Sequence, residues 1–287
     1  MKNNITIKNE QLTVEISTSG AQLQSIKSAK GSEYLWQGDE RYWGDRAPVL
    51  FPVCGCLYDG KHTYQGKTYY MNAHGFARKT DFTAESVTGD KAVLLITDTE
   101  ETRECYPFGF EMRAIFELLE NKINVTYRVN NKTDGEIYFS VGAHEGYLLT
   151  GDYKDYSIVF EGENSVDNAL LSGPFLNGAS EEIKLNGGEW TLDDDFFAKH
   201  DTMIIKNIRK KSVLLHSKNT PNTVRVDFDG FDNLLLWKEP GGNFLCIEPW
   251  CGLPDYDGKV SDLSAKEGII KLEKDGVFEV THTITVD

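Results

Sequence analysis

Alternation of apolar and polar residues with a period of two recurs along this 287-residue chain and constrains its fold more than any other feature. Because successive side chains of a β-strand point to opposite faces, each alternating run predicts a strand with one buried face. The runs are clearest at residues 12–16, 123–129, 224–228 and 278–286. Shorter runs predict further strands at residues 64–70, 93–96, 204–205 and 213–215.

Turn residues separate these runs, and helical patterns are scarce. Turn signals fall at residues 58–61, 88–90, 119–121, 131–135 and 274–276. The best helix candidate, residues 262–268, covers one or two turns at most. No amphipathic segment of a dozen residues is available to connect parallel strands. We therefore expect an all-β fold, a large antiparallel β-sandwich that forms a single domain over residues 1–287.

An acidic charge balance narrows the range of partners. The chain has 30 Lys and Arg against 45 Asp and Glu, and its net charge of −15 repels nucleic acid. A local pair of Arg still admits one small anionic ligand, because distant charges are screened. No run approaches the ~18 apolar residues of a membrane span, and no signal peptide precedes the first strand. With five scattered Cys, these features predict a cytoplasmic monomer or homodimer that binds a small molecule.

Glu248 is the first candidate for chemistry. It follows the strand-like residues 244–247, and Pro249 cannot continue a ladder, so we expect Glu248 at a strand end facing a cleft. Burial beside Trp250 would raise its pKa and suit it to act as a base. The alternative is a carboxylate that pairs with an Arg for structural reasons.

His144 is the second candidate, because small residues surround it and an imidazole changes charge near neutral pH. Adjacent Glu145 can keep His144 protonated only if the two side chains meet. Neighbouring residues in a strand face opposite sides, which argues against this contact. His74, before Gly75, is a similar candidate. For each of the two His, a core histidine with one hydrogen bond is the alternative. The remaining His are expected to be solvated: His62, His200, His216 and His282.

Arg46 and Arg78 each flank an apolar motif, where a guanidinium needs a carboxylate, a phosphate or a ligand hydroxyl. If they converge, they form an anion clamp. Equally, each of them can neutralise a neighbour such as Asp45 or Asp81.

Several other chemistries find no support in the sequence. The Cys spacings do not match a zinc pattern and lack His at ligand spacing, so the five thiols are expected to be reduced core residues. No glycine-rich nucleotide loop and no serine nucleophile elbow is present. We therefore expect no cofactor and no metal.

Four motifs, taken in order, resemble one known family. They are R-A-P-V-L-F-P (residues 46–52), H-G-F-A-R (74–78), S-V-G-A-H (140–144) and C-I-E-P-W (246–250). Together they resemble the aldose 1-epimerase (galactose mutarotase-like) superfamily, and within it the LacX-like branch. The resemblance extends from about residue 12 to residue 285.

This resemblance implies a β-supersandwich that interconverts the α and β anomers of a free hexose or hexose 6-phosphate without a cofactor. It implies His144 as general acid and Glu248 as general base. The residues it implies for substrate binding are Arg46, His74, Arg78 and Asp201. The chain departs from the family at Glu145, where Pro is common, and at Ala73, where relatives acting on hexose 6-phosphates usually carry Gln.

Two alternatives remain beside the epimerase. One is a sugar-binding or regulatory module on the same sandwich, which Glu145 in the acid loop keeps open. The other is a glycoside hydrolase, whose catalytic groups would normally be two carboxylates rather than His and Glu.

Overall fold

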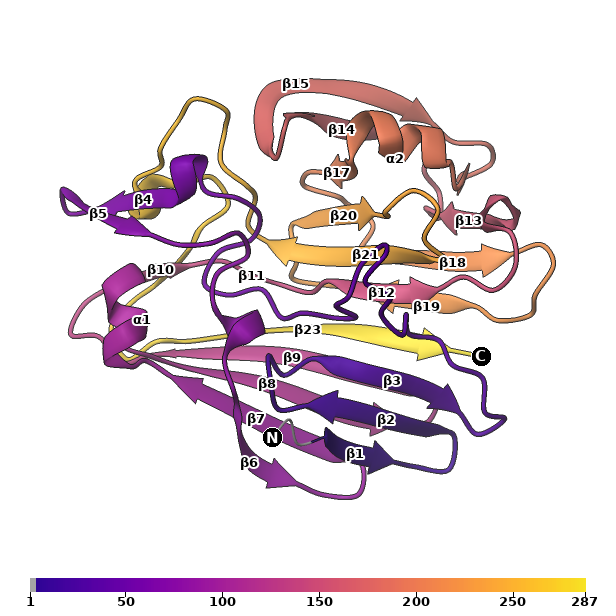
Figure 1. Cartoon of the computed structure of the whole chain (residues 1–287), viewed down its shortest axis with the longest axis horizontal. Coiled ribbons are helices and arrows are strands. Elements are labelled where there is room, and N and C mark those ends of the chain that lie inside the picture. The colour runs from indigo at the N-terminus through magenta and orange to yellow at the C-terminus, as the bar shows by residue number, and fades with distance from the viewer. Residues whose placement is uncertain (1–3) are drawn as a thin grey trace.

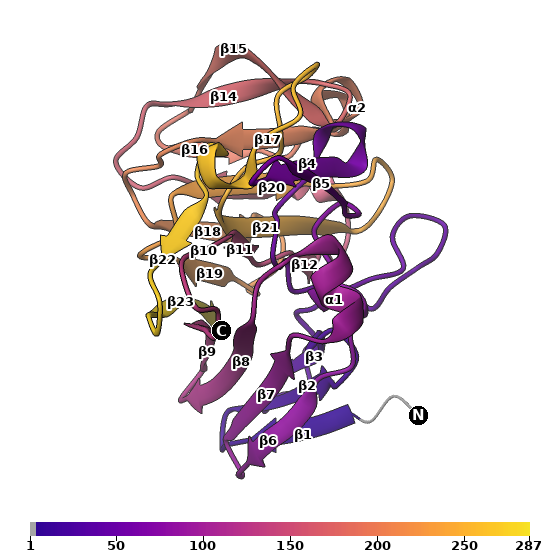
Figure 2. The same cartoon turned by 90° about the vertical axis from the view of Figure 1, so that its left-hand side faces the viewer.

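The computed structural model describes residues 4–287 and consists mainly of two antiparallel β-sheets that pack face to face. In Figure 1, β6 to β9 and β23 of one sheet lie below β20 and β21 of the other, and β14, β15 and β17 lie at the top. Figure 2, turned by 90°, shows β14 and β15 at one end of the molecule and β6 to β8 at the other. The all-β, antiparallel β-sandwich predicted from the sequence is confirmed. Among residues 4–287, none of the helices has both the length and the apolar character needed to cross a membrane.

The larger sheet has nine strands, and four of its eight neighbouring pairs are consecutive in the chain. Their spatial order is β16 (Glu189–Thr191), β13 (Tyr156–Val159), β18 (Ser212–Ser217), β19 (Val224–Asp227), β23 (Val277–Val286), β9 (Lys122–Asn131), β8 (Phe110–Leu119), β7 (Lys91–Thr97) and β6 (Thr83–Val87).

The second sheet has seven strands and carries the candidate residues. Its strands are β11 (Val141–Gly142), β12 (Glu145–Leu148), β21 (Phe244–Cys251), β20 (Asn233–Trp237), β17 (Thr202–Ile205), β14 (Ser165–Ser172) and β15 (Phe175–Lys184), with β11 and β12 both pairing with β21. Smaller sheets are formed by β1 (Asn4–Lys8), β2 (Leu12–Ser17) and β3 (Leu23–Ser28), by β4 (Lys61–Tyr64) and β5 (Lys67–Tyr70), and by β10 (Ile137–Phe139) and β22 (Ile270–Leu272).

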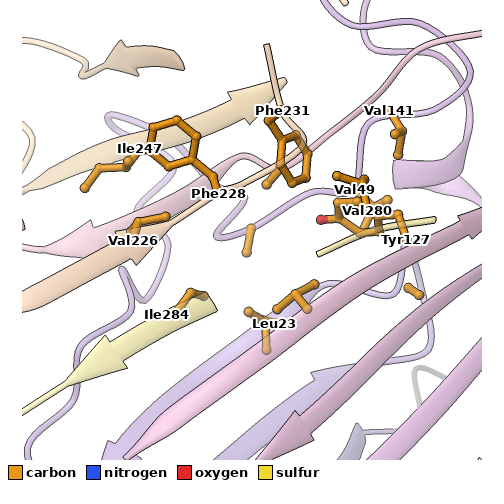
Figure 3. Close-up of a cluster of buried hydrophobic side chains, with 14 of the residues drawn as sticks. Leu23, Val49, Tyr127, Val141, Val226, Phe228, Phe231, Ile247, Val280 and Ile284 are labelled. Carbon is orange, nitrogen blue, oxygen red and sulfur yellow. The ribbon is translucent and has the colours of Figure 1, made fainter. Parts of the chain in front are cut away.

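The core lies between the two large sheets. Figure 3 shows side chains from both layers, among them Ile247 of β21 and Ile284 of β23, in one continuous apolar layer. The main cluster of buried apolar residues extends in sequence from Ile7 to Val286. Because a shared core is the mark of one folding unit, we propose that the chain is a single domain.

One local expectation from the sequence is wrong, and another is met only by a single short turn. Residues 64–70 are not one strand, because Gln65 and Gly66 adopt positive φ angles of 50° and 77° and turn the chain between β4 and β5. Residues 262–268 contain only the 3-10 turn Leu263–Ala265.

The α-helices lie elsewhere, at α1 (Glu100–Cys105) and α2 (Asp194–His200). Each begins at a capping side chain, Thr99 or Asp193, that accepts a hydrogen bond from the first turn. Single 3-10 turns add Tyr58–Gly60, Ala77–Lys79 and Tyr153–Asp155.

Candidate active site

Strand β21 presents Glu248 on the face of the seven-stranded sheet that points away from the core. Alternation along the strand places Cys246, Glu248 and Trp250 on this face. Leu245 and Ile247 point the other way, into the main core cluster. Glu248 is nevertheless only 1% exposed, because side chains from neighbouring segments cover this face.

The sequence predicted that the strand ends at Glu248. In the structure it continues through Pro249 to Cys251. The Pro249 carbonyl accepts a hydrogen bond from Ala143 N–H. The ring nitrogen of Pro249 faces the same side as this carbonyl, toward Ala143. Ala143 lies between the end of β11 and the start of β12. The missing N–H therefore falls at a break in the ladder, where proline is tolerated.

His144 lies in that break, directly opposite Glu248. On either side of the break, Gly142 pairs with Trp250 and Glu145 pairs with Ile247. Both pairs have the same register, and continuing it through the break places His144 opposite Glu248. The distance from His144 Nε2 to Glu248 Oε2 is 3.4 Å. His144 is 9% exposed, so both groups of the pair are buried.

Burial disfavours the charged form of both groups. Desolvation lowers the pKa of His144 well below its usual range, with smaller contributions from His74 and Arg78. Desolvation also raises the pKa of Glu248 well above its usual range, and the charges of Glu145 and Asp201 act in the same direction. A neutral imidazole beside a protonated carboxyl is thus the favoured form.

Glu145 points away from this site, into the core between the sheets. Its Oε1 lies 3.0 Å from His282 Nε2 in β23, and the two residues are 2% and 0% exposed. Glu145 therefore does not hold a proton on His144 by direct contact. The prediction that His62 and His282 are solvated is wrong, since both are 0% exposed, whereas His200 and His216 are partly exposed.

His74 lies beside the pair of His144 and Glu248. Its ring centroid lies 5.6 Å from that of His144. Gly55 N–H donates to His74 Nδ1 at 3.2 Å, so in the neutral ring the proton is on Nε2. Burial lowers the pKa of His74 to about 4, and Arg78 adds to this shift. His74 is therefore a neutral hydrogen-bond donor at neutral pH.

Backbone geometry fixes the His74 loop tightly. His74 has a φ of 64°, and its own N–H donates to Gly55 O. At Gly75, with a φ of 72°, a Cβ atom would lie 2.2 Å from Phe51 O, so no larger residue fits. Beside the loop lies a surface hollow of about 710 Å³, lined in part by Ala73 and Gly75.

The two candidate arginines have protein partners. Arg78 Nη2 lies 2.7 Å from Asp45 Oδ2, which is one of the two neighbours considered from the sequence. Arg46 Nη1 donates to the carbonyl of Gln24 and to Gln37 Oε1. Asp45 therefore offsets the charge of Arg78, and this contact favours neutralisation over an anion clamp.

Asp201 directly follows α2. It ends α2 with a φ of 62° and is exposed, and it lines a hollow of about 430 Å³ together with His200. Its charge contributes to the raised pKa of Glu248.

Three residues of the site were missed from the sequence: Trp43, Trp237 and Cys246. The Trp43 ring stacks on His144 with centroids 5.0 Å apart, and Trp237 meets His144 edge-on at 5.7 Å. Cys246 is a buried, free thiol, as expected, and it also stands two residues from Glu248 on the same face of β21. One ligand atom from each of His144, Cys246 and Glu248 lies within 4.8 Å of the others, an arrangement able to hold a metal ion.

The sequence and the fold both match known proteins. Residues 3–257 match the family model described as Aldose 1-epimerase. The plasmid and chromosomal LacX proteins of Lactococcus lactis subsp. lactis are each 34% identical over 292 residues, covering 96% of this chain and 94% of the relative.

Among solved structures, a galactose mutarotase related enzyme from Lactobacillus acidophilus is 33% identical with a TM-score of 0.93, covering 99% of this chain and 97% of that one. A galactose mutarotase-like protein from Lactobacillus casei ATCC 334 is 27% identical with a TM-score of 0.94, covering 99% and 100%.

Proposed function

The chain belongs to the aldose 1-epimerase family, and we propose that it interconverts the α and β anomers of a free hexose by acid–base opening and reclosing of the sugar ring. The observation that supports this most strongly is the buried pair of His144 and Glu248, set opposite each other on paired strands and 3.4 Å apart. A proton donor and a proton acceptor held at this separation suit two oxygens that share one anomeric carbon.

In the proposed reaction the pair carries one proton in total. When His144 holds it, the imidazolium donates to the ring oxygen while Glu248 takes the proton of the anomeric hydroxyl. The bond between the ring oxygen and the anomeric carbon breaks, and that carbon becomes an aldehyde. The pair is left with neutral His144 and protonated Glu248, which is the form that burial favours. Rotation of the aldehyde and the reverse proton transfers close the ring to either anomer.

Residues around the pair are proposed to hold the sugar. His74 and Asp201 would bind hydroxyl groups, as would Arg46 and Arg78 where their bonds to protein partners allow it. Trp43, half-buried and stacked on His144, offers an apolar ring face of the kind that packs against a sugar. We place the reaction in the cytoplasm, because the five cysteines are unpaired.

The test of this function follows the optical rotation of freshly dissolved α-D-glucose and α-D-galactose with and without the protein. Acceleration of mutarotation by the wild type supports the proposal, and its absence with every aldose contradicts it. Glu145 was the reason to consider a non-catalytic binding module. Because its side chain faces away from the site, this reason is weakened. A glycoside hydrolase would release the leaving group from chromogenic glycosides, and we expect none.

The contact between Arg78 and Asp45 predicts a preference for unphosphorylated sugars. Changing Asp45→Asn frees the guanidinium, so kcat/KM for a hexose 6-phosphate should rise ~2–5-fold relative to that for the free hexose, as expected for a partly exposed charge pair. NMR of the anomeric protons measures both rates. Asp81→Asn, which alters an exposed carboxylate of the same region, is the control and should leave the ratio of kcat/KM for the two sugars unchanged. An equal change for both sugars in Asp45→Asn would argue that Asp45 acts on the fold alone.

A further inference from the structure

The structure assigns a soft divalent metal site, best suited to Zn²⁺, to His144, Cys246 and Glu248, and metal bound there blocks turnover. The three ligand atoms lie within 4.8 Å of one another, and the residues are 9%, 0% and 1% exposed. The metal-binding half of this inference stands on geometry alone. The inhibitory half rests on the proposed function.

One of the three distances between ligand atoms already suits the ion. Zinc bonds to sulfur, nitrogen and oxygen in a tetrahedral site set neighbouring ligand atoms about 3.4 to 3.6 Å apart. His144 Nε2 and Glu248 Oε2 already meet this at 3.4 Å. Cys246 and Glu248 alternate on one face of β21, so the thiol and the carboxylate point the same way. Three protein ligands leave a fourth position for water, as in open zinc sites.

The polar atoms of this site are not satisfied by the protein. Glu248 Oε2 and His144 Nδ1 are buried and have no hydrogen-bond partner among the described residues. A sugar hydroxyl can satisfy the first, but the proposed acid–base reaction has no use for the Cys246 thiol. A thiol beside an imidazole and a carboxylate is instead a donor set that binds zinc.

Metal occupancy and turnover exclude each other. A bound Zn²⁺ takes the lone pair of His144 and the carboxylate of Glu248, the two groups that must carry and accept protons. Binding also releases the proton of the Cys246 thiol to solvent. Mg²⁺ and Ca²⁺ prefer oxygen ligands alone, so they should neither bind here nor inhibit.

The first experiment titrates the full-length, metal-free protein with Co²⁺, which reports its ligands in the absorption spectrum. We expect one Co²⁺ per chain and a near-ultraviolet thiolate-to-cobalt charge-transfer band that Zn²⁺ abolishes. Cys246→Ala should lose the band and bind Zn²⁺ at least ~100-fold more weakly, because one of three ligands is gone. Cys56 is a partly exposed thiol outside the cluster, so Cys56→Ser should keep both the charge-transfer band and the Zn²⁺ affinity.

Other outcomes overturn the inference. No charge-transfer band in the wild type, or a band that persists in Cys246→Ala, excludes this site. If Cys246→Ala fails to give a cooperative thermal transition, Glu248→Gln replaces it and should keep the band with a weaker affinity. An unchanged affinity in Glu248→Gln counts against the carboxylate ligand.

A second experiment measures mutarotation in the presence of Zn²⁺ and then of EDTA. We expect at least ~10-fold loss of rate and full recovery with EDTA, with no effect of Mg²⁺. Zinc that binds without slowing the reaction overturns the inhibitory half alone. A protein that binds Co²⁺ as expected but accelerates no aldose contradicts the proposed function and leaves the metal site standing.

Discussion

Glu248→Gln should lower the rate of mutarotation ~10²–10⁴-fold, the contribution expected of a positioned acid–base group. Gln is nearly isosteric and keeps hydrogen-bonding capacity, but it can neither accept the anomeric proton nor return it. Mutarotation is measured by polarimetry under metal-free conditions, so that a change in metal binding does not enter. A variant with near wild-type activity would exclude Glu248 as the base.

The same substitution should make the protein more stable at pH 8. Burial, with Glu145 and Asp201, raises the folded-state pKa of Glu248 above its unfolded value. As the pH rises above ~4.5, the unfolded state releases this proton while the folded state retains it, so folding stability falls. Gln removes this loss, and we expect Tm at pH 8 to rise by ~2 °C or more. At pH 4 the variant and the wild type should differ little.

Glu267→Gln is the matched control, because its shift has the opposite sign. Although partial burial opposes it, hydrogen bonds from Lys206 and Tyr256 lower the pKa of Glu267. Its contribution to stability is present at pH 8 and is lost as the pH falls, so Gln should lower Tm at pH 8. Glu267→Gln should also leave mutarotation intact. Equal changes in Tm for both variants would show that the sign of the pKa shift does not govern stability here.

The fold class was predictable because the alternating pattern is local and repeated. Residues 123–129 and 278–286 fall inside the ten-residue strands β9 and β23, and their apolar positions face the core. Features that depend on one or two residues were missed. The turn at Gln65 and Gly66 joins two strands too short to show a period. The short helices begin at capping residues, Thr99 and Asp193, and carry no amphipathic pattern.

The motifs singled out His74, His144 and Glu248, which the structure brings together, but they did not predict the geometry of this cluster. The pairing of His144 with Glu248 depends on the break between β11 and β12, which no local pattern predicts. Trp43 contacts His144 from a loop, and loops have no hydrophobic periodicity from which such a contact could be predicted. His282 did leave a signal, because it shares the inward phase of Val280 and Ile284 on β23. Its partner Glu145 lies on the other sheet, so the pair depends on how the sheets stack.

Lys266→Ala should reduce the free energy of unfolding by ~3–5 kcal/mol, the usual loss when one partner of a buried ion pair is removed. Lys266 Nζ contacts Asp255 Oδ1, and the two side chains are 1% and 0% exposed. Asp255 also accepts hydrogen bonds from Tyr58 N–H at 2.9 Å and Ser261 Oγ at 2.8 Å. This carboxylate therefore fastens the segment after β21 to the segment that precedes β4. Without Lys266 it remains buried beside neutral donors only.

Urea denaturation of two lysine variants isolates the effect of burial. Lys274→Ala removes the partner of Asp134, an ion pair whose side chains are 57% and 91% exposed, and should leave the unfolding midpoint close to that of the wild type. Adding Asp255→Asn to Lys266→Ala should restore part of the lost stability, because the uncompensated charge is then gone. A Lys266→Ala midpoint as close to the wild type as that of Lys274→Ala would mean that water reaches Asp255. A double variant less stable than Lys266→Ala would mean that the hydrogen bonds from Tyr58 and Ser261 matter more than the charge.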